Sequence, residues 1–290
     1  MKLTFGIVAA TIFLFLFSAF TTPKEKTPSL GIVAPLEQDS LIYASGFRML
    51  GESVGRMLSP SLSEEQFGAN LARIKAAKCN VHICNIFIGG RLKIAGPNVD
   101  EARVLGYADT VFSRAQRAGV SMIILGSGGA RRVPDGYDQQ KAQADFAVLC
   151  RKLAAVAQKY KIMIALESLE ATETNFLITL KSAADVVRAV NHPAFKLNAD
   201  IFHMMREGES AQSIIDAGDL LVYCEIAEKE KRSLPGVMGD DFKPYLRALK
   251  KVKYTGHIFI EGNTTNPAND IPLSFKYLTK QLEEVYAEKE

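Results

Sequence analysis

The sequence has few cysteines, and none of them lies in a metal-binding or redox pattern. The four are Cys79, Cys84, Cys150 and Cys224, and no two of them form a Cys-x-x-Cys pair. This spacing argues against a cysteine-based zinc site and against a disulfide framework. Because three of the four lie in or beside apolar strand or helix patterns, we expect buried free thiols.

The sequence also lacks a basic run and a glycine-rich phosphate turn. Its 35 lysines and arginines are interspersed with 32 acidic residues, and the formal net charge is only +3. This balance argues against nucleic acid as a partner. The first apolar run ends in Ala34-Pro35-Leu36, without the glycine fingerprint of an open, doubly wound sheet that binds dinucleotides.

One long apolar run stands at the N-terminus. Lys2 precedes a mostly apolar stretch from Phe5 to Phe20, and a polar segment follows it. A basic residue before such a run is typical of a secretory signal peptide. We therefore predict a signal peptide over residues 1–22 and a secreted or periplasmic protein that leaves the membrane after cleavage. An uncleaved anchor is the alternative, because the run is nearly long enough to cross a bilayer.

Beyond residue 28, short apolar runs alternate with longer amphipathic segments. Eight runs predict strands buried on both faces of a parallel sheet, over residues 30–35, 47–54, 81–88, 121–125, 162–167, 195–200, 220–227 and 257–261. Helical spacing predicts helices over residues 64–77, 138–160, 181–190, 242–252 and 273–286. This alternation predicts an α/β fold, a single (β/α)8 TIM barrel over residues 29–290, with a doubly wound sheet as the rival.

Acidic residues close four neighbouring predicted strands. Glu167 and Asp200 end the fifth and sixth strands, Glu225 lies in the seventh, and Glu261 ends the eighth. Because the active sites of these barrels lie at the C-terminal ends of the strands, we expect the four carboxylates to share one mouth. Their repulsion and burial predict a divalent cation between them. For any single one, a helix cap or a solvated loop residue is the alternative.

The segments around these residues resemble a known family. The motifs that carry the resemblance cover residues 165–170, 173–176, 197–204, 232–236, 239–240 and 254–262. Their order and spacing are similar to those of the sugar isomerases and epimerases with xylose-isomerase-like barrels. That group includes ketose 3-epimerases, sugar-phosphate isomerases and inosose dehydratases.

The resemblance implies roles for individual residues. The four carboxylates would ligate a divalent metal, and Glu167 and Glu261 would also act as opposing acid and base. His203 would contact the substrate near the metal, and Arg232 would bind a substrate hydroxyl or carbonyl oxygen. The family usually has histidine where this chain has Glu225. An all-oxygen set favours Mn or Mg, with Co or Zn as alternatives.

Other polar residues are weaker candidates for the site. Glu52 ends the second strand and could contact a substrate, although a helix cap or a salt bridge explains it equally well. Arg131 follows glycines that let backbone approach a ligand, and it could bind an oxygen-rich substrate. His82 lies inside an apolar strand and is predicted to be a core residue. His257 begins the eighth strand, at the end opposite the mouth, and is not expected to be a ligand.

The resemblance implies a metal-dependent sugar isomerase or epimerase that removes a proton beside a carbonyl through a metal-stabilised enediolate. A metal-dependent lyase or dehydratase on 3-keto-glycosides or keto-sugars is the alternative, because an exported enzyme meets glycosides more readily than sugar phosphates. A third hypothesis is a sugar-binding barrel weakened by Glu225. The related DNA-repair endonucleases use several metal-binding histidines, whereas this chain has four histidines in all. Barrels of this group often pair, so a homo-oligomer is also expected.

Overall fold

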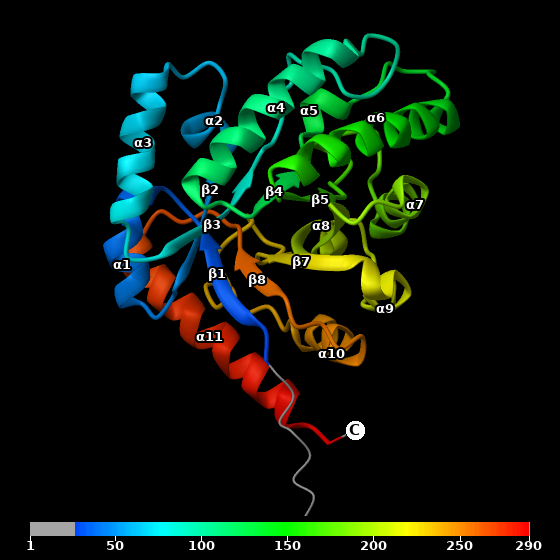
Figure 1. Ribbon diagram of the computed structural model, residues 1–290. Coiled ribbons are helices and arrows are strands. Elements are labelled where there is room, and N and C mark those ends of the chain that lie inside the picture. The colour runs from blue at the N-terminus through cyan, green and yellow to red at the C-terminus, as the bar shows by residue number, and fades with distance from the viewer. Residues whose placement is uncertain (1–26, 290) are drawn as a thin grey trace, which may run out of the picture.

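The strands form a closed barrel in the computed structural model, which describes residues 27–289. They are β1 (Ser29–Val33), β2 (Met49–Ser53), β3 (Asn80–Asn85), β4 (Met122–Leu125), β5 (Met163–Glu167), β6 (Phe195–Asp200), β7 (Leu221–Ile226) and β8 (His257–Ile260). Each pairs in parallel with its neighbours in chain order, and β1 closes the barrel against β8 (Figure 1). The predicted TIM barrel is confirmed. The predicted signal peptide lies outside the described residues.

Helices surround the strands on the outside of the barrel (Figure 1). The longer ones are α3 (Glu64–Ala76), α4 (Glu101–Ala118), α6 (Gln139–Lys159), α7 (Leu180–Val190), α10 (Lys243–Lys251) and α11 (Pro267–Ala287). The short ones are η1 (Leu36–Gln38), α1 (Asp39–Ala44), α2 (Val54–Met57), α5 (Gly128–Arg131), α8 (Ile201–Arg206), α9 (Gln212–Ala217) and η2 (Gly218–Leu220). All five predicted helices are present, and α4 was not predicted.

Local signals account for where several helices begin and end. Ser63 and Gln66 form the capping box that starts α3, each side chain accepting a hydrogen bond from the other's backbone N–H. Asp100 caps α4 in a similar way, and Gly119 ends that helix in the left-handed conformation. The last helix begins at Pro267, earlier than predicted, and Pro272 is accommodated inside it.

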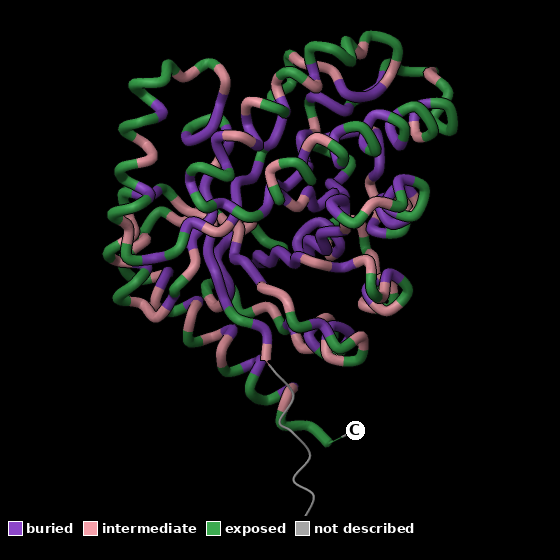
Figure 2. Tube along the Cα trace, in the orientation of Figure 1, coloured by how far each residue is buried: buried purple, intermediate pink, exposed green. Residues whose placement is uncertain are grey.

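Apolar side chains fill the barrel interior and the layer between strands and helices. Figure 2 shows that the buried parts of the chain lie mainly in the strands and on the inward sides of the helices. Within the barrel, the side chains of Ile83, Ile124, Tyr223 and Phe259 pack together. A Cβ at Gly31 would overlap the Phe259 ring, so the absence of a side chain at Gly31 leaves room for that ring. Because the interior is filled with side chains, polar functional groups are expected at the rim formed by the C-terminal ends of the strands. All four cysteines are buried and free, as predicted.

A small cluster of polar side chains lies at the N-terminal end of the barrel. The rings of His82 and His257 meet edge to face with centroids 4.7 Å apart. The Ser29 hydroxyl lies 2.8 Å from Nδ1 of His257, and the Ser121 hydroxyl bonds to His82. As predicted, His257 lies away from the mouth.

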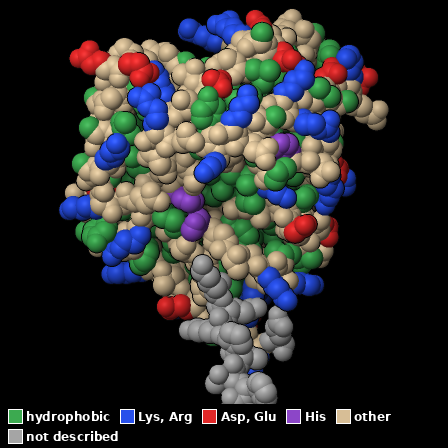
Figure 3. Space-filling view, viewed as in Figure 1, with side chains coloured by type: hydrophobic (Ala, Val, Ile, Leu, Met, Phe, Trp, Pro, Cys, Tyr) green, Lys and Arg blue, Asp and Glu red, His purple; other side chains and the backbone are tan. Residues whose placement is uncertain are grey.

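Charged side chains of both signs are scattered over the visible face of the molecule, with no large single-sign patch (Figure 3). Among residues 27–289, no helix combines the length and apolar character that crossing a bilayer requires.

Candidate active site

The four predicted carboxylates converge at the C-terminal rim of the barrel. One oxygen from each of Glu167, Asp200, Glu225 and Glu261 lies within 4.8 Å of the others. The strand register brings these carboxylates together, because Asp200 and Glu225 are paired residues at the ends of β6 and β7. Glu225 is completely buried, whereas Glu261 is partly exposed. The cluster is therefore set deep in the mouth and opens to solvent on one side.

Two carboxylate oxygens of the cluster have no hydrogen-bond partner. Asp200 Oδ1 caps α8 by accepting from the backbone N–H of Phe202 at 2.8 Å. Its Oδ2 is buried and accepts no hydrogen bond, although Nε2 of His203 and Nη2 of Arg232 lie 3.5 and 3.6 Å away. Glu225 Oε2 accepts from Nδ2 of Asn198 at 2.5 Å, which leaves Oε1 buried and unpaired. Buried carboxylate oxygens that accept no hydrogen bond are strongly unfavourable. These oxygens therefore fit a divalent cation, which the four carboxylates would hold.

Burial also changes the proton affinity of these groups. It raises the pKa of Glu167 to about 7, with help from the charges of Asp200 and Glu261. Burial likewise raises the pKa of Glu225 well above its ordinary value, and the neighbouring carboxylates add to that shift. The pKa of Glu261 rises because of burial, although the nearby Arg232 guanidinium opposes the shift. A bound cation would relieve the same repulsion.

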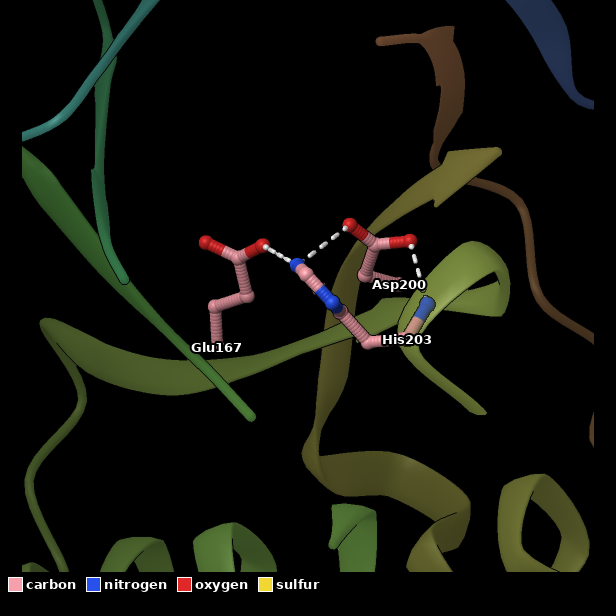
Figure 4. Close-up of side chains that lie close together, drawn as sticks. All are labelled: Glu167, Asp200 and His203. Carbon is pink, nitrogen blue, oxygen red and sulfur yellow. Dashed lines mark hydrogen bonds and ion pairs between the residues drawn. The ribbon is translucent and has the colours of Figure 1, made fainter. Parts of the chain in front are cut away.

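His203 lies between two of the carboxylates (Figure 4). Its Nε2 is 3.5 Å from Glu167 Oε1 and 3.5 Å from Asp200 Oδ2, and its Nδ1 accepts the backbone N–H of Glu170 at 3.2 Å. Because Nδ1 is an acceptor, the ring proton belongs on Nε2. Burial lowers the pKa of His203, but in the metal-free cluster the charges of Asp200 and Glu167 outweigh it and bring that pKa to about 9. A cation held by those carboxylates would oppose a second ring proton and favour the neutral ring with its proton on Nε2. His203 is thus a proton donor facing the cluster.

Arg232 reaches the cluster from the loop after β7. Its Nη2 pairs with Glu261 Oε2, its Nε donates to the Glu261 carbonyl at 3.2 Å, and its Nη1 lies 3.3 Å from Glu173. The guanidinium also stacks 4.7 Å from the Phe202 ring centroid. These contacts fix the donors of Arg232 beside the carboxylate of Glu261.

A cavity of about 250 Å³ opens over these groups. Its walls include Asn85, Ile86, Gly126, Ser127, Gly128, Glu167, Leu169, Glu173, His203, Arg232 and Glu261. Asn85, at the end of β3, donates its amide to Glu261 Oε1. A Cβ at Gly126 would overlap the Glu167 carboxylate, so this glycine leaves room for the carboxylate. Sequence reasoning missed Asn85, whose one signal was a polar residue ending an apolar run.

Glu52 and Arg131 do not line this cavity, which corrects the prediction that they contact a substrate. The Glu52 carboxylate accepts the backbone N–H of Leu36 at 2.8 Å and of Ser53 at 3.1 Å. Arg131 is completely buried, and its Nη1 donates to the Glu167 carbonyl at 2.5 Å. Both side chains satisfy backbone groups instead, and Arg131 supports the end of β5 from behind.

Glu228 is a buried residue that sequence reasoning also missed. Its carboxylate gathers the loop that carries Arg232, accepting from the Ser233 hydroxyl and from the backbone N–H groups of Gly236, Met238, Gly239 and Asp240 at 2.5–3.3 Å. In the same loop, Lys231 and Arg232 adopt positive φ values of 58° and 50°. Such conformations are unfavourable outside glycine and persist where surrounding contacts fix them. Glu228 therefore positions Arg232 without touching the cavity.

Part of the chain is similar in sequence to an L-ribulose 3-epimerase from Methylomonas sp. (strain DH-1). The two are 32% identical over 128 residues, which is 44% of each protein. The chain therefore matches less than half the length of this relative.

Solved structures share the fold over most of the chain. A 3-keto-D-glucoside 4-epimerase from E. coli superposes with a TM-score of 0.73 at 21% identity, covering 87% of this chain and 99% of that one. A D-allulose 3-epimerase from Methylomonas sp. gives a TM-score of 0.75 at 18% identity, covering 88% and 98%.

The sequence pattern of a protein family, described as the xylose isomerase-like TIM barrel, matches residues 44–281 of this chain. This match takes in all of the motifs on which the resemblance was based and seven of the eight strands. The chain belongs to the xylose isomerase-like TIM barrel family.

Proposed function

We propose that this protein is a divalent-metal-dependent sugar epimerase or isomerase acting on a hydroxy-ketone. The observation that carries the proposal is the cluster of four carboxylates beside a cavity that Glu167 and Glu261 line, in which buried oxygens of Asp200 and Glu225 accept no hydrogen bond. The partial relationship to an L-ribulose 3-epimerase and the shared fold of a D-allulose 3-epimerase support it.

The residues divide the work by position. Glu167, on β5, and Glu261, after β8, come from well-separated strands and both line the cavity. One takes a proton from the carbon beside the carbonyl, and the other returns a proton. Return to the opposite face gives an epimer, and return to the neighbouring carbon gives an isomer. A bound cation would lower the pKa of Glu167 from its metal-free value of about 7, so the carboxylate would be ionised and able to accept the proton.

Three other components assist. A bound divalent cation would stabilise the negative charge that develops on the substrate oxygens, and the ligand chemistry favours Mn²⁺ or Mg²⁺ over Co²⁺ or Zn²⁺. His203 directs its Nε2 proton toward the carboxylates, and Arg232 presents guanidinium N–H groups at the cavity wall. Both can donate hydrogen bonds to a carbonyl or hydroxyl oxygen of the sugar.

A second candidate is a lyase on 3-keto-glycosides. The shared fold of a 3-keto-D-glucoside 4-epimerase favours a keto-glycoside as the substrate, although that protein is named an epimerase. The same carboxylates would remove the proton beside the keto group, but the leaving group on the next carbon would depart instead of a proton returning. A barrel that binds sugar without turnover is the third outcome.

One experiment separates these functions. Metal-loaded protein is incubated in D₂O with ketopentoses, ketohexoses or a methyl 3-keto-glucoside, and the products are followed by proton NMR. Deuterium at the carbon beside the carbonyl, together with a new epimer or isomer, is the expected result. Release of methanol from the glycoside would establish the lyase. Saturable sugar binding with neither exchange nor product would overturn the enzymatic proposal.

We also propose that the protein is exported. The apolar run from Phe5 to Phe20 behind Lys2 supports this proposal. Expression of the full chain with a C-terminal tag, fractionation and N-terminal sequencing would test it. We expect a processed N-terminus near residue 22 in the exported fraction, and an intact Met1 in the cytosolic fraction would contradict it.

A further inference from the structure

We propose that the Asn198–Glu225 pair makes the metal centre an all-oxygen site that binds Mg²⁺ or Mn²⁺. The ratio of zinc affinity to manganese affinity should then be smaller than in a site with an imidazole ligand. This inference rests on the metal dependence in the proposed function, but not on the sugar chemistry. It assigns Asn198 as a positioning residue that acts through Glu225.

The pair lies inside the barrel and is sealed from solvent. Asn198 on β6 and Glu225 on β7 are both completely buried, and Asn198 Nδ2 donates to Glu225 Oε2 at 2.5 Å. The reversed amide would place Oδ1 against the carboxylate, acceptor against acceptor, so the amide orientation is fixed. Because Oε2 is engaged, Glu225 offers one free oxygen, Oε1, to the cluster.

The nearby imidazole cannot supply a nitrogen donor in this arrangement. Nε2 of His203 lies near Glu167 and Asp200, and these three residues could by distance alone surround an ion. To bind a metal through Nε2, the ring would have to carry its proton on Nδ1. That proton would then face the backbone N–H of Glu170, which already donates to Nδ1 at 3.2 Å. The donor–donor contact excludes that tautomer and leaves carboxylates as the ligands.

Ligand chemistry then decides the ion. Zinc gains most from imidazole and thiolate donors, whereas Mg²⁺ and Mn²⁺ are served by carboxylate oxygens. Zinc still binds oxygen sites tightly by intrinsic affinity, so the effect is a smaller ratio of zinc affinity to manganese affinity. Asn198 maintains this state by holding the Glu225 carboxylate with one oxygen turned inward. Loss of such outer contacts typically weakens metal binding about 10–100-fold.

The test measures metal binding without any sugar. Metal-free full-length protein is titrated calorimetrically with Mn²⁺, Mg²⁺ and Zn²⁺, and the Mn²⁺-loaded protein is studied by pulsed EPR for coupling to imidazole nitrogen. The variants are Glu225→His, Asn198→Ala and Asn198→Asp, with Asn98→Ala in an exposed loop as the matched control. Melting curves of the metal-free proteins verify that each variant is folded.

We expect no imidazole nitrogen coupling in the wild type, and new coupling in Glu225→His with at least a tenfold rise in the zinc-to-manganese affinity ratio. Asn198→Ala should weaken Mn²⁺ binding about tenfold, and Asn198→Asp, which keeps the shape but repels Glu225, should weaken it further. Nitrogen coupling in the wild type, an unchanged ratio in Glu225→His or wild-type binding in both Asn198 variants would overturn the inference. Because no sugar is present, these results do not depend on whether the sugar chemistry is correct.

Discussion

The two ends of this barrel both carry titratable side chains, but the histidines at one end are hydrogen-bonded, whereas the carboxylates at the other end keep buried oxygens that accept no hydrogen bond. At the N-terminal end, His82 and His257 contact each other, and Ser121 and Ser29 bond to them. At the C-terminal mouth, buried polar atoms of Asp200, Glu225 and His203 have no hydrogen-bond partner. Native proteins rarely leave such groups unsatisfied, so an incomplete set at the mouth marks the place where a ligand completes it.

The largest expected effect comes from removing the acid and base of the mouth. Glu167→Gln and Glu261→Gln should each lower kcat by at least about 100-fold, because an amide cannot accept the proton that the reaction removes. Steady-state kinetics with the best substrate from the NMR screen measures this loss. Wild-type turnover in either variant would show that the two carboxylates have other roles.

Glu52→Gln is the matched control for these two variants. Glu52 is also a buried carboxylate at the end of a strand, but it binds the backbone N–H of Leu36 and lies outside the cavity. We expect wild-type kcat with a lower melting temperature, because the amide replaces a carboxylate that accepts two backbone hydrogen bonds.

The second effect tests how closely the mouth is fitted. In Gly126→Ala the new methyl group would overlap Glu167 Oε2 and displace the carboxylate. A misplacement near 1 Å can reduce catalysis about 100-fold, so we expect kcat to fall by one to two orders of magnitude in a folded protein. Gly106→Ala in α4 is the control, because a Cβ there meets nothing within 4 Å. That change should stabilise the helix by about 0.5–1 kcal/mol and leave kcat unchanged.

A smaller effect is expected behind the mouth, at Glu228. In Glu228→Gln, an NH₂ group would face several of the backbone N–H groups that the carboxylate now accepts. The Arg232 loop should loosen, raising KM about tenfold while the metal affinity, measured by calorimetry, stays at the wild-type value. A parallel loss of metal affinity would mean that Glu228 supports the whole rim.

Much of this arrangement was predictable because it follows from burial and from strand ends. The strands are continuous apolar runs, and the four carboxylates end neighbouring runs. The helix α4 was missed although its buried residues Val104, Ala108, Val111 and Ala115 recur at helical spacing. The cap at Asp100 and the glycine at 119 were further signals of its two ends.

Side-chain direction was the harder part. Arg131 follows glycines after β4, as expected, but the short helix α5 turns its guanidinium behind β5 to backbone carbonyls. Asn198 lies in a motif on which the resemblance was based, yet its role depends on Glu225, a partner on the next strand. Sequence spacing locates strand ends, but it does not show which buried polar groups bind one another across strands.

The smallest effect concerns the N-terminal end, where the paired histidines should contribute to stability in a pH-dependent way. Burial, together with the neighbouring His257, lowers the pKa of His82 from 6.5 to about 4. The unfolded chain therefore binds a proton more readily than the folded protein between these values, so stability falls as the pH drops through this window. Because His82 is only partly buried, we expect His82 to account for about 1 kcal/mol of the loss. Urea unfolding at pH 7 and pH 4.5 measures the loss of unfolding free energy between these two pH values. We expect a smaller loss for His82→Asn than for the wild type. Equal losses would show that the N-terminal end of the barrel contributes nothing to acid sensitivity.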